Sequence, residues 1–275
     1  MRNEIGQTES SYIEANRAAW NEAAPIHARR TFEALRQGFA TPGFSSLQRP
    51  QEVERLRALQ LQDKNVIQLC CNNGRELLSI KNLFGAGSCL GVDISDEFVG
   101  QARALNEAAK LDVEFLRANV FELPESVLGG FDLVYITVGA FGWMPDCAAF
   151  TALISSLLRP GGQVFIYEMH PMLDAFDETD YREPLAFRRS YMQSEPNVLS
   201  HGLDYLSNDT YKSRLMYWFH HKTSDIIGGL LRAGVGVTAF DEFDHDISNV
   251  FAHLERLAAR PPLSYILQGV KLDLR

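Results

Sequence analysis

The chain has 275 residues, of which 26 are lysine or arginine and 35 are aspartate or glutamate, and its formal net charge is −9. Because 46% of the residues are hydrophobic and 11% are aromatic, a disordered or fibrous protein is excluded, and the length fits one large domain with an elaboration. The acidic balance, with no basic run longer than two arginines, argues against binding of nucleic acid through its phosphates.

The apolar pattern predicts N-terminal helices followed by alternating strands and helices. Residues 16–35 predict short helices interrupted at Pro25, since proline inside a helix removes a backbone donor, and a further helix is expected over 51–61. Strands are then expected at 66–71, 88–93, 113–116, 131–136 and 163–167, and helices at 75–83, 95–110 and 148–158, the last closed by a turn at 159–162. This alternation predicts βαβ units and a parallel sheet with helices on both faces.

The regular alternation stops after the fifth predicted strand. Residues 171–222 combine aromatic side chains with turn formers, and they predict an insertion of short antiparallel strands. The remaining expected elements are a helix at 225–233, a strand at 236–243, a helix near 250–259 and a strand at 264–272. Together these elements predict an α/β fold with seven strands, a β-rich insertion and a helical cap over 1–62.

The cysteines and the N-terminus indicate the cellular compartment. Cys70, Cys71, Cys89 and Cys147 lack zinc-site spacing, and adjacent Cys70 and Cys71 would point to opposite faces of a strand. We therefore expect reduced thiols and no metal. Residues 1–11 lack the apolar core of a signal peptide, and no stretch approaches the length of a membrane span. These features predict a cytoplasmic protein without a membrane anchor, either a monomer or a homodimer.

A ligand site is expected at the carboxyl ends of the first strands, where open parallel sheets bind ligands. Gly74 follows the first strand and opens a helix, so free N–H groups and the positive dipole end face the crevice. Asp93 ends the second strand 19 residues later, near the spacing at which a carboxylate meets both ribose hydroxyls. After the third strand, the Asn119 amide and its apolar neighbours Val120 and Phe121 are placed to bracket a purine edge.

A dinucleotide would also fit this general arrangement. Its pyrophosphate needs G-x-G-x-x-G for close backbone approach, however, and the turn here has the single glycine Gly74. The expected order of the last elements also fits a seven-stranded sheet better than a six-stranded parallel one. An NAD-dependent enzyme is therefore the weaker alternative.

In these motifs the sequence resembles the class I S-adenosylmethionine-dependent methyltransferases, over residues 64–271. The matching segments, in order, are 66–74, 91–95, 117–124, 131–135 with 139–143, and 157–162. The resemblance implies a Rossmann-like core over 63–275, with an acceptor-cap insertion at about 171–222, and methyl transfer to a small molecule. It also implies that S-adenosylmethionine contacts Leu69, Cys70, Cys71, Asn72, Asn73, Gly74, Asp93, Ile94, Asn119, Val120, Phe121 and Thr137.

The first motif departs from the family pattern. Gln68 stands where an acid is usual, and Cys70 and Asn72 stand where glycines are usual. Asn119 stands where many members have aspartate. These departures leave open a protein that binds the cofactor, or S-adenosylhomocysteine, without transferring a methyl group. Arg75 is expected to meet either the methionine carboxylate of the cofactor or an acid on the solvent side.

The acceptor pocket is expected between the N-terminal segment and the insertion, because members of the family build it there. The residues predicted to line it are Trp20, His27, Arg30, Phe141, Trp143 and Trp218. Aromatic walls offer cation–π contacts to a sulfonium and exclude water. Together with the cationic cofactor, the net charge favours a small neutral or cationic acceptor over a polyanion.

A hydroxyl acceptor would need a general base, and histidine suits that task near neutral pH. His170 follows the fifth strand at the crevice end of the sheet, and His220 and His221 lie where the insertion rejoins the core. Each is a candidate base, and each could instead hold the insertion by hydrogen bonds. An amine or an activated carbon as acceptor would need no base.

Overall fold

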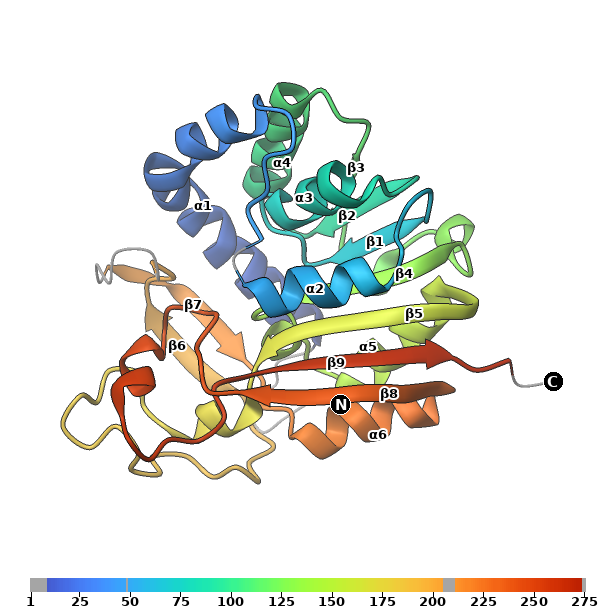
Figure 1. The fold of residues 1–275 in the computed structure, drawn as a ribbon. Helices are drawn as coiled ribbons and strands as arrows, with labels where there is room; N and C mark the ends of the chain where they lie inside the picture. Colours follow the sequence, from blue (N-terminus) through green and yellow to red (C-terminus); the bar gives the residue numbers. More distant parts are fainter. Residues whose placement is uncertain (1–8, 48, 205–210, 274–275) are drawn as a thin grey trace.

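The computed structural model describes residues 9–47, 49–204 and 211–273, and a sheet covered by helices forms its centre (Figure 1). The strands of this sheet are β1 (Val66–Leu69), β2 (Cys89–Asp93), β3 (Glu114–Arg117), β4 (Phe131–Thr137), β5 (Leu158–Met169), β8 (Val235–Phe243) and β9 (Ser264–Lys271). Their spatial order is β3-β2-β1-β4-β5-β9-β8, and β9 runs antiparallel to both of its neighbours. This architecture confirms the predicted α/β fold with a seven-stranded, mostly parallel sheet.

Helices cover both faces of the sheet. Helices α5 (Cys147–Leu157) and α6 (Thr223–Arg232) pack on one face, and α2 (Pro50–Ala58), α3 (Arg75–Phe84) and α4 (Asp96–Ala109) pack on the other. Side chains along each strand enter the two apolar layers in turn, because successive residues of a strand point to opposite faces. No helix in the described part of the chain is long and apolar enough to cross a membrane.

The prediction of interrupted N-terminal helices is wrong, because Glu9–Phe39 forms one continuous helix, α1, that passes through Pro25. Ala23 and Ala24 beside the proline are fully buried, and the Ala24 carbonyl accepts a hydrogen bond from Gln101 Nε2 of α4 at 3.1 Å. Packing along α4 thus stabilises the helix against the loss of one backbone donor.

Two further local predictions are wrong. Residues 159–162 belong to β5 rather than to a separate turn, and a register shift between Phe131 and Leu133 of β4 accommodates them. The helix expected near 250–259 is only a short 3₁₀ helix, Ala252–Arg256. The Asp246 carboxylate accepts hydrogen bonds from the backbone N–H groups of Ser248 and Phe251, which precede this 3₁₀ helix. Such local hydrogen bonds compete with a regular helix.

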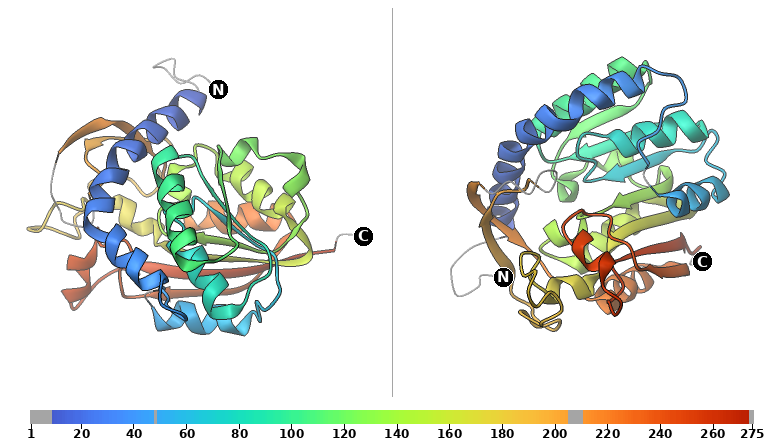
Figure 2. Two further views of the ribbon diagram at one scale, coloured as in Figure 1. Left: turned by 90° about the horizontal axis from the view of Figure 1, so that it is seen from above. Right: turned by 60° about the vertical axis from the view of Figure 1, so that its left-hand side comes forward.

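The insertion forms the expected antiparallel pair, β6 (Asn197–His201) and β7 (Lys212–Trp218). Strand β7 contacts α1, where the Tyr12 ring lies 4.6 Å from the Tyr217 ring and 5.4 Å from the Phe219 ring, measured between centroids. Figure 2 shows α1 and this pair together at one end of the sheet. They cover the end at which the parallel strands finish.

A buried acid–phenol pair joins α2 to the sheet. The Tyr135 hydroxyl of β4 donates to Glu52 Oε1 at 2.5 Å, and both side chains are buried. Burial raises the pKa of Glu52 to about 7. The folded state therefore binds a proton that the unfolded state has already released, and stability falls as the pH rises from about 4.5 to 7.

We expect Glu52→Gln to remove this pH dependence, because the amide keeps an acceptor for Tyr135 and carries no charge. Relative to the variant, the wild type should lose roughly 2–3 kcal/mol of unfolding free energy between pH 5 and pH 8. Urea unfolding at the two pH values measures this loss. Glu54→Gln, an exposed position on the same helix, serves as the control and should follow the wild type. Equal pH dependence in all three proteins would contradict the assignment.

Candidate functional site

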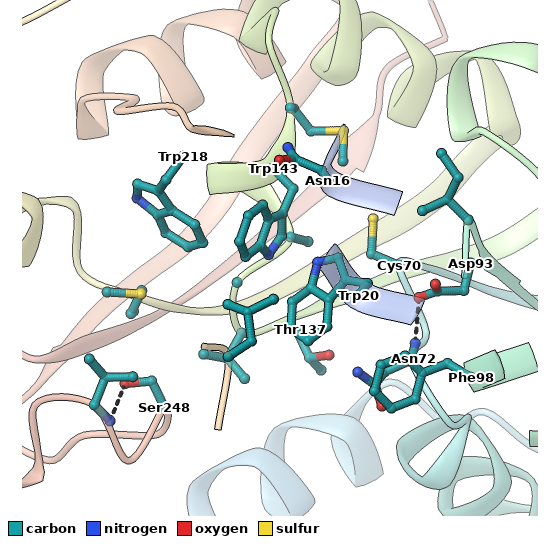
Figure 3. A pocket seen from close by; sticks show the side chains of 18 of the residues that line it. Asn16, Trp20, Cys70, Asn72, Asp93, Phe98, Thr137, Trp143, Trp218 and Ser248 are labelled. Atoms are coloured by element: carbon teal, nitrogen blue, oxygen red, sulfur yellow. Dashed lines mark hydrogen bonds between the residues drawn. The ribbon is translucent and has the colours of Figure 1, made fainter. Parts of the chain in front are cut away.

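A cavity of about 320 Å³ lies at the carboxyl ends of the parallel strands. Its walls come from the ends of β1 to β4, from α1, from the insertion and from the segment 247–251 between β8 and β9. Figure 3 shows Asp93, Cys70 and Asn72 on one side of this space and Trp218 and Ser248 on the other. Segments far apart in the sequence therefore enclose one continuous space.

Most of the residues predicted to contact a cofactor line this cavity, namely Cys70, Cys71, Asn72, Asn73, Asp93, Ile94, Asn119, Val120, Phe121 and Thr137. Leu69 and Gly74 do not. Leu69 is fully buried in the core under α5 and α6. Gly74 has a φ of +72°, and a Cβ there would lie 2.4 Å from the Phe115 ring, so this glycine allows α3 to begin against β3.

The turn after β1 keeps a glycine-like backbone without the usual glycines. Cys70 and Asn72 have φ values of +55° and +50°, in the left-handed region that other residues rarely adopt. The Asn72 side chain accepts from the Asn73 N–H at 2.8 Å, and the Asn72 N–H donates to Asp93 Oδ2 at 2.7 Å. These bonds stabilise the turn in a backbone conformation that glycine adopts most readily.

Asp93 is the central carboxylate of the strand-end half of the cavity. Its Oδ1 accepts from the Ser95 N–H at 2.9 Å, in addition to the bond from Asn72 to Oδ2. Burial raises the pKa of Asp93 to about 6, although the backbone donors oppose this shift. At neutral pH the group is therefore ionised, and each oxygen has a further lone pair for a ligand hydroxyl.

Two buried polar residues support the loop after β4. Gln68 donates from Nε2 to Thr137 Oγ1 at 3.2 Å, and its Oε1 has no hydrogen-bond partner among the described residues. Glu168, which sequence reasoning missed, accepts from the N–H groups of Gly139 at 2.6 Å and Met169 at 2.9 Å. Burial raises the pKa of Glu168 to about 7. Since Gly139 lines the cavity, Glu168 positions part of its wall.

All three tryptophans of the chain line the cavity. Trp20 comes from α1, Trp143 from the segment after β4 and Trp218 from the end of β7. The Trp20 and Trp143 rings lie 5.3 Å apart and the Trp143 and Trp218 rings 4.9 Å apart, both edge to face. Figure 3 shows the three indoles in a row. They form an aromatic wall between the strand ends and the insertion.

Of the other residues predicted to line the acceptor pocket, one lines the cavity and two do not. His27 lines the cavity, its Nε2 lies 2.6 Å from the Leu203 carbonyl, and burial lowers its pKa. Arg30 and Phe141 do not line it. Arg30 lies 3.6 Å from the Asp204 carboxylate, and Phe141 is buried in the core against Phe150.

The structure places His170, His220 and His221 outside the cavity wall. His170 accepts the Met172 N–H at Nδ1 and lies 2.9 Å from Glu242 at Nε2. His220 bridges the Asp174 carboxylate and the Tyr191 carbonyl at 2.9 and 2.7 Å. His221 Nε2 lies 2.8 Å from the Met144 carbonyl. Each contact supports the local fold, and a role as base stays a prediction.

Arg75, expected to meet either the methionine carboxylate of the cofactor or an acid on the solvent side, lines the cavity and is paired with Glu76 at 2.6 Å. Three further charged residues of the cavity, Glu178, Arg189 and His201 of the insertion, were not predicted from the sequence. They come from loops and a short strand without helical periodicity, which explains why the pattern missed them.

Comparison with known proteins agrees with this geometry. Residues 66–162 match the model of a methyltransferase domain. Demethylmenaquinone methyltransferase of Lactococcus lactis is 33% identical over 117 residues, which cover 42% of this chain and 46% of that protein. Ubiquinone biosynthesis O-methyltransferase of Aromatoleum aromaticum is 28% identical over 116 residues, with 42% and 48% covered. The chain thus spans about half the length of these curated relatives.

Solved structures share the fold over most of the chain. A methyltransferase of Mesorhizobium loti that depends on S-adenosylmethionine has a TM-score of 0.57 at 21% identity, over 80% of this chain and 97% of that chain. Geranyl diphosphate C-methyltransferase of Streptomyces coelicolor has a TM-score of 0.55 at 11% identity, over 81% and 79%. These likenesses show the fold.

The closure of the cavity depends on Asn16 of α1. Asn16 Nδ2 donates to the Tyr217 carbonyl at 2.9 Å, and the Tyr217 N–H donates to Asn16 Oδ1 at 2.7 Å. Asn16→Ala should lower the unfolding free energy by about 2 kcal/mol, because both backbone groups of Tyr217 lose their partner. Urea unfolding tests this expectation against Gln37→Ala, an exposed change on the same helix. A loss no larger than that of the control would show that the pair does not hold α1.

Proposed function

We propose that this chain, whose residues 66–162 belong to the methyltransferase domain family, transfers a methyl group from S-adenosylmethionine to a small organic acceptor. The observation that carries this proposal is the cavity at the carboxyl ends of β1 to β4, where Asp93, the Asn72–Asn73 turn and Asn119 come together. The N-terminal segment 1–62 and the insertion at about 171–222 serve as the acceptor cap; residues 1–8, 48 and 205–210 lie outside the described residues.

The residues present fit the cofactor. The Asp93 carboxylate suits the two ribose hydroxyls, because it is half-buried, fixed by two backbone donors and ionised at neutral pH. Asn119 accepts the Phe121 N–H at 3.1 Å, which fixes the amide beside the apolar wall that would receive the adenine. The turn 70–73 and Thr137 bound the remaining space. When bound, the cofactor supplies an electrophilic methyl group.

The chain itself contributes positioning and exclusion of water. The tryptophan wall separates the cofactor half from the insertion and presents indole faces and edges to an acceptor. The cover formed by α1 and β7 keeps water from the reacting atoms. His170, His220 and His221 are all held outside the cavity wall, whereas the lining His27 contacts the Leu203 carbonyl and the lining His201 faces Glu178. An acceptor whose nucleophilic atom needs no separate base therefore suits the site best.

The acceptor class has support from two sources. One relative is named for demethylmenaquinone and the other for ubiquinone biosynthesis. Quinones are small molecules, so both names support a small-molecule acceptor. The charge of −9 argues against a nucleic acid partner. We further propose a cytoplasmic enzyme that works as a monomer or homodimer.

Transfer of labelled methyl from S-adenosylmethionine into a metabolite extract, with the product identified by mass, tests the proposed activity directly. We expect one dominant labelled small molecule. Calorimetry with S-adenosylmethionine, S-adenosylhomocysteine and NAD separates the alternatives. Binding of the sulfur compounds without any labelled product would indicate a binding protein, and heat with NAD alone would indicate a dinucleotide enzyme.

Asp93→Ala should weaken binding of S-adenosylhomocysteine at least tenfold, because the ribose hydroxyls lose their acceptor. In the wild type, affinity should also fall as the pH drops below about 6, where Asp93 becomes protonated. Calorimetry at pH 5 and pH 7.5 measures both effects. Asp112→Ala, an exposed aspartate that pairs with Lys81 away from the cavity, is the control and should bind normally. Unchanged affinity in Asp93→Ala would show that the ribose lies elsewhere.

A further inference from the structure

The insertion end of the cavity carries a cluster of three charged side chains, Arg189, Glu178 and His201. Glu178 Oε2 lies 3.7 Å from Arg189 Nη2, and Glu178 Oε1 lies 3.4 Å from His201 Nε2. The carboxylate raises the pKa of His201, which favours the protonated ring. Arg189 and His201 thus share one carboxylate at distances longer than a close ion pair.

Arg189 is held in place by the backbone of the insertion. Its Nη1 donates to the Phe176 carbonyl at 2.6 Å and to the Asp174 carbonyl at 3.4 Å, and its own N–H donates to the Ala175 carbonyl at 3.1 Å. A guanidinium fixed in this way loses little conformational entropy when it binds an anion. Its position at the cavity wall is therefore preorganised for a carboxylate.

The other carboxylates of the cavity already have donors. Asp174 accepts from Trp218 Nε1 at 2.9 Å and faces His220 Nδ1 at 2.9 Å. Glu76, on the strand-end side, is paired with Arg75 at 2.6 Å. Among the described residues at the insertion end, Glu178 lies beyond hydrogen-bond distance of the guanidinium, at 3.7 Å from Arg189 Nη2. An anion at this wall of the cavity would therefore find Arg189 as a hydrogen-bond donor.

Asp174 also connects the guanidinium to the aromatic wall. Its backbone carbonyl accepts from Arg189, and its carboxylate accepts from the indole N–H of Trp218. The Trp218 ring in turn packs edge to face on Trp143. One residue therefore fixes the cation relative to the aromatic wall, an arrangement that recognises a rigid ligand with an acidic group at its edge.

We propose that the acceptor is a planar aromatic acid whose ring lies against Trp143 and Trp218 and whose carboxylate is bound by Arg189. This inference rests on the proposed function, since it names the acceptor class of the same cavity. The carboxylate selects and orients the acceptor. Arg189 is thus a residue that determines specificity, separate from the cofactor contacts at Asp93.

The test is calorimetry with a matched pair of probes, 2-naphthoate and its neutral analogue 2-naphthamide, on protein saturated with S-adenosylhomocysteine. The wild type should bind the acid at least tenfold more tightly than the amide. Arg189→Gln should abolish this preference, and Arg189→Lys should restore part of it. The control is Arg188→Gln, because Arg188 is adjacent in sequence but pairs with Asp180 and Glu183 outside the cavity.

Equal affinity of the wild type for acid and amide, or no binding of either, would overturn the inference. The same loss of preference in Arg188→Gln and Arg189→Gln would do so as well. S-adenosylhomocysteine is titrated separately beforehand, so the two proposals fail independently. Binding of S-adenosylhomocysteine without a preference for 2-naphthoate over 2-naphthamide overturns the Arg189 inference and leaves the proposed function intact. A preference for 2-naphthoate without binding of S-adenosylhomocysteine supports the Arg189 subsite and contradicts the proposed function.

Discussion

The cavity exists because Asn16 joins α1 to β7 across 201 residues of sequence. The parallel strands alone would leave only an open edge, at which backbone groups and side chains such as Asp93 face solvent. The Asn16 amide satisfies both the N–H and the carbonyl of Tyr217, and the aromatic contacts of Tyr12 extend the same interface. The position of Trp20 on α1 and the exclusion of water proposed for the site both depend on this closure.

The sequence predicted the sheet well, because the signal for it is local. Strand and helix periods alternate from Val66 onward, and the position of Asp93 follows from the place where β2 ends. The errors occur where distant contacts decide the structure. Pro25 lies inside a helix because α4 packs along it, and the amide of Gln101 that ties the two helices together is 76 residues away in the chain. No pattern within a short window carries that information.

The two halves of the candidate site also differ in how well the sequence predicts them. The strand-end half of the cavity was predictable because residues at strand ends share one edge, although Gly74 is needed for packing against Phe115. The insertion half was not predictable. A histidine after a strand can point to either side, and His220 points to Asp174 and the Tyr191 carbonyl. Likewise, the net charge of −9 favoured a neutral or cationic acceptor, whereas a cationic side chain, Arg189, lies at the cavity wall. A total over the whole chain does not describe a few side chains at one wall.

The gathering of all three tryptophans around one cavity has an optical consequence. Indole emission responds to the polarity and contacts of each ring, and rings about 5 Å apart exchange excitation energy efficiently. No tryptophan elsewhere in the chain adds a constant background, since the sequence contains only Trp20, Trp143 and Trp218. The intrinsic fluorescence of the unlabelled protein is therefore a built-in reporter of what occupies the cavity, and it makes compound libraries accessible to direct screening.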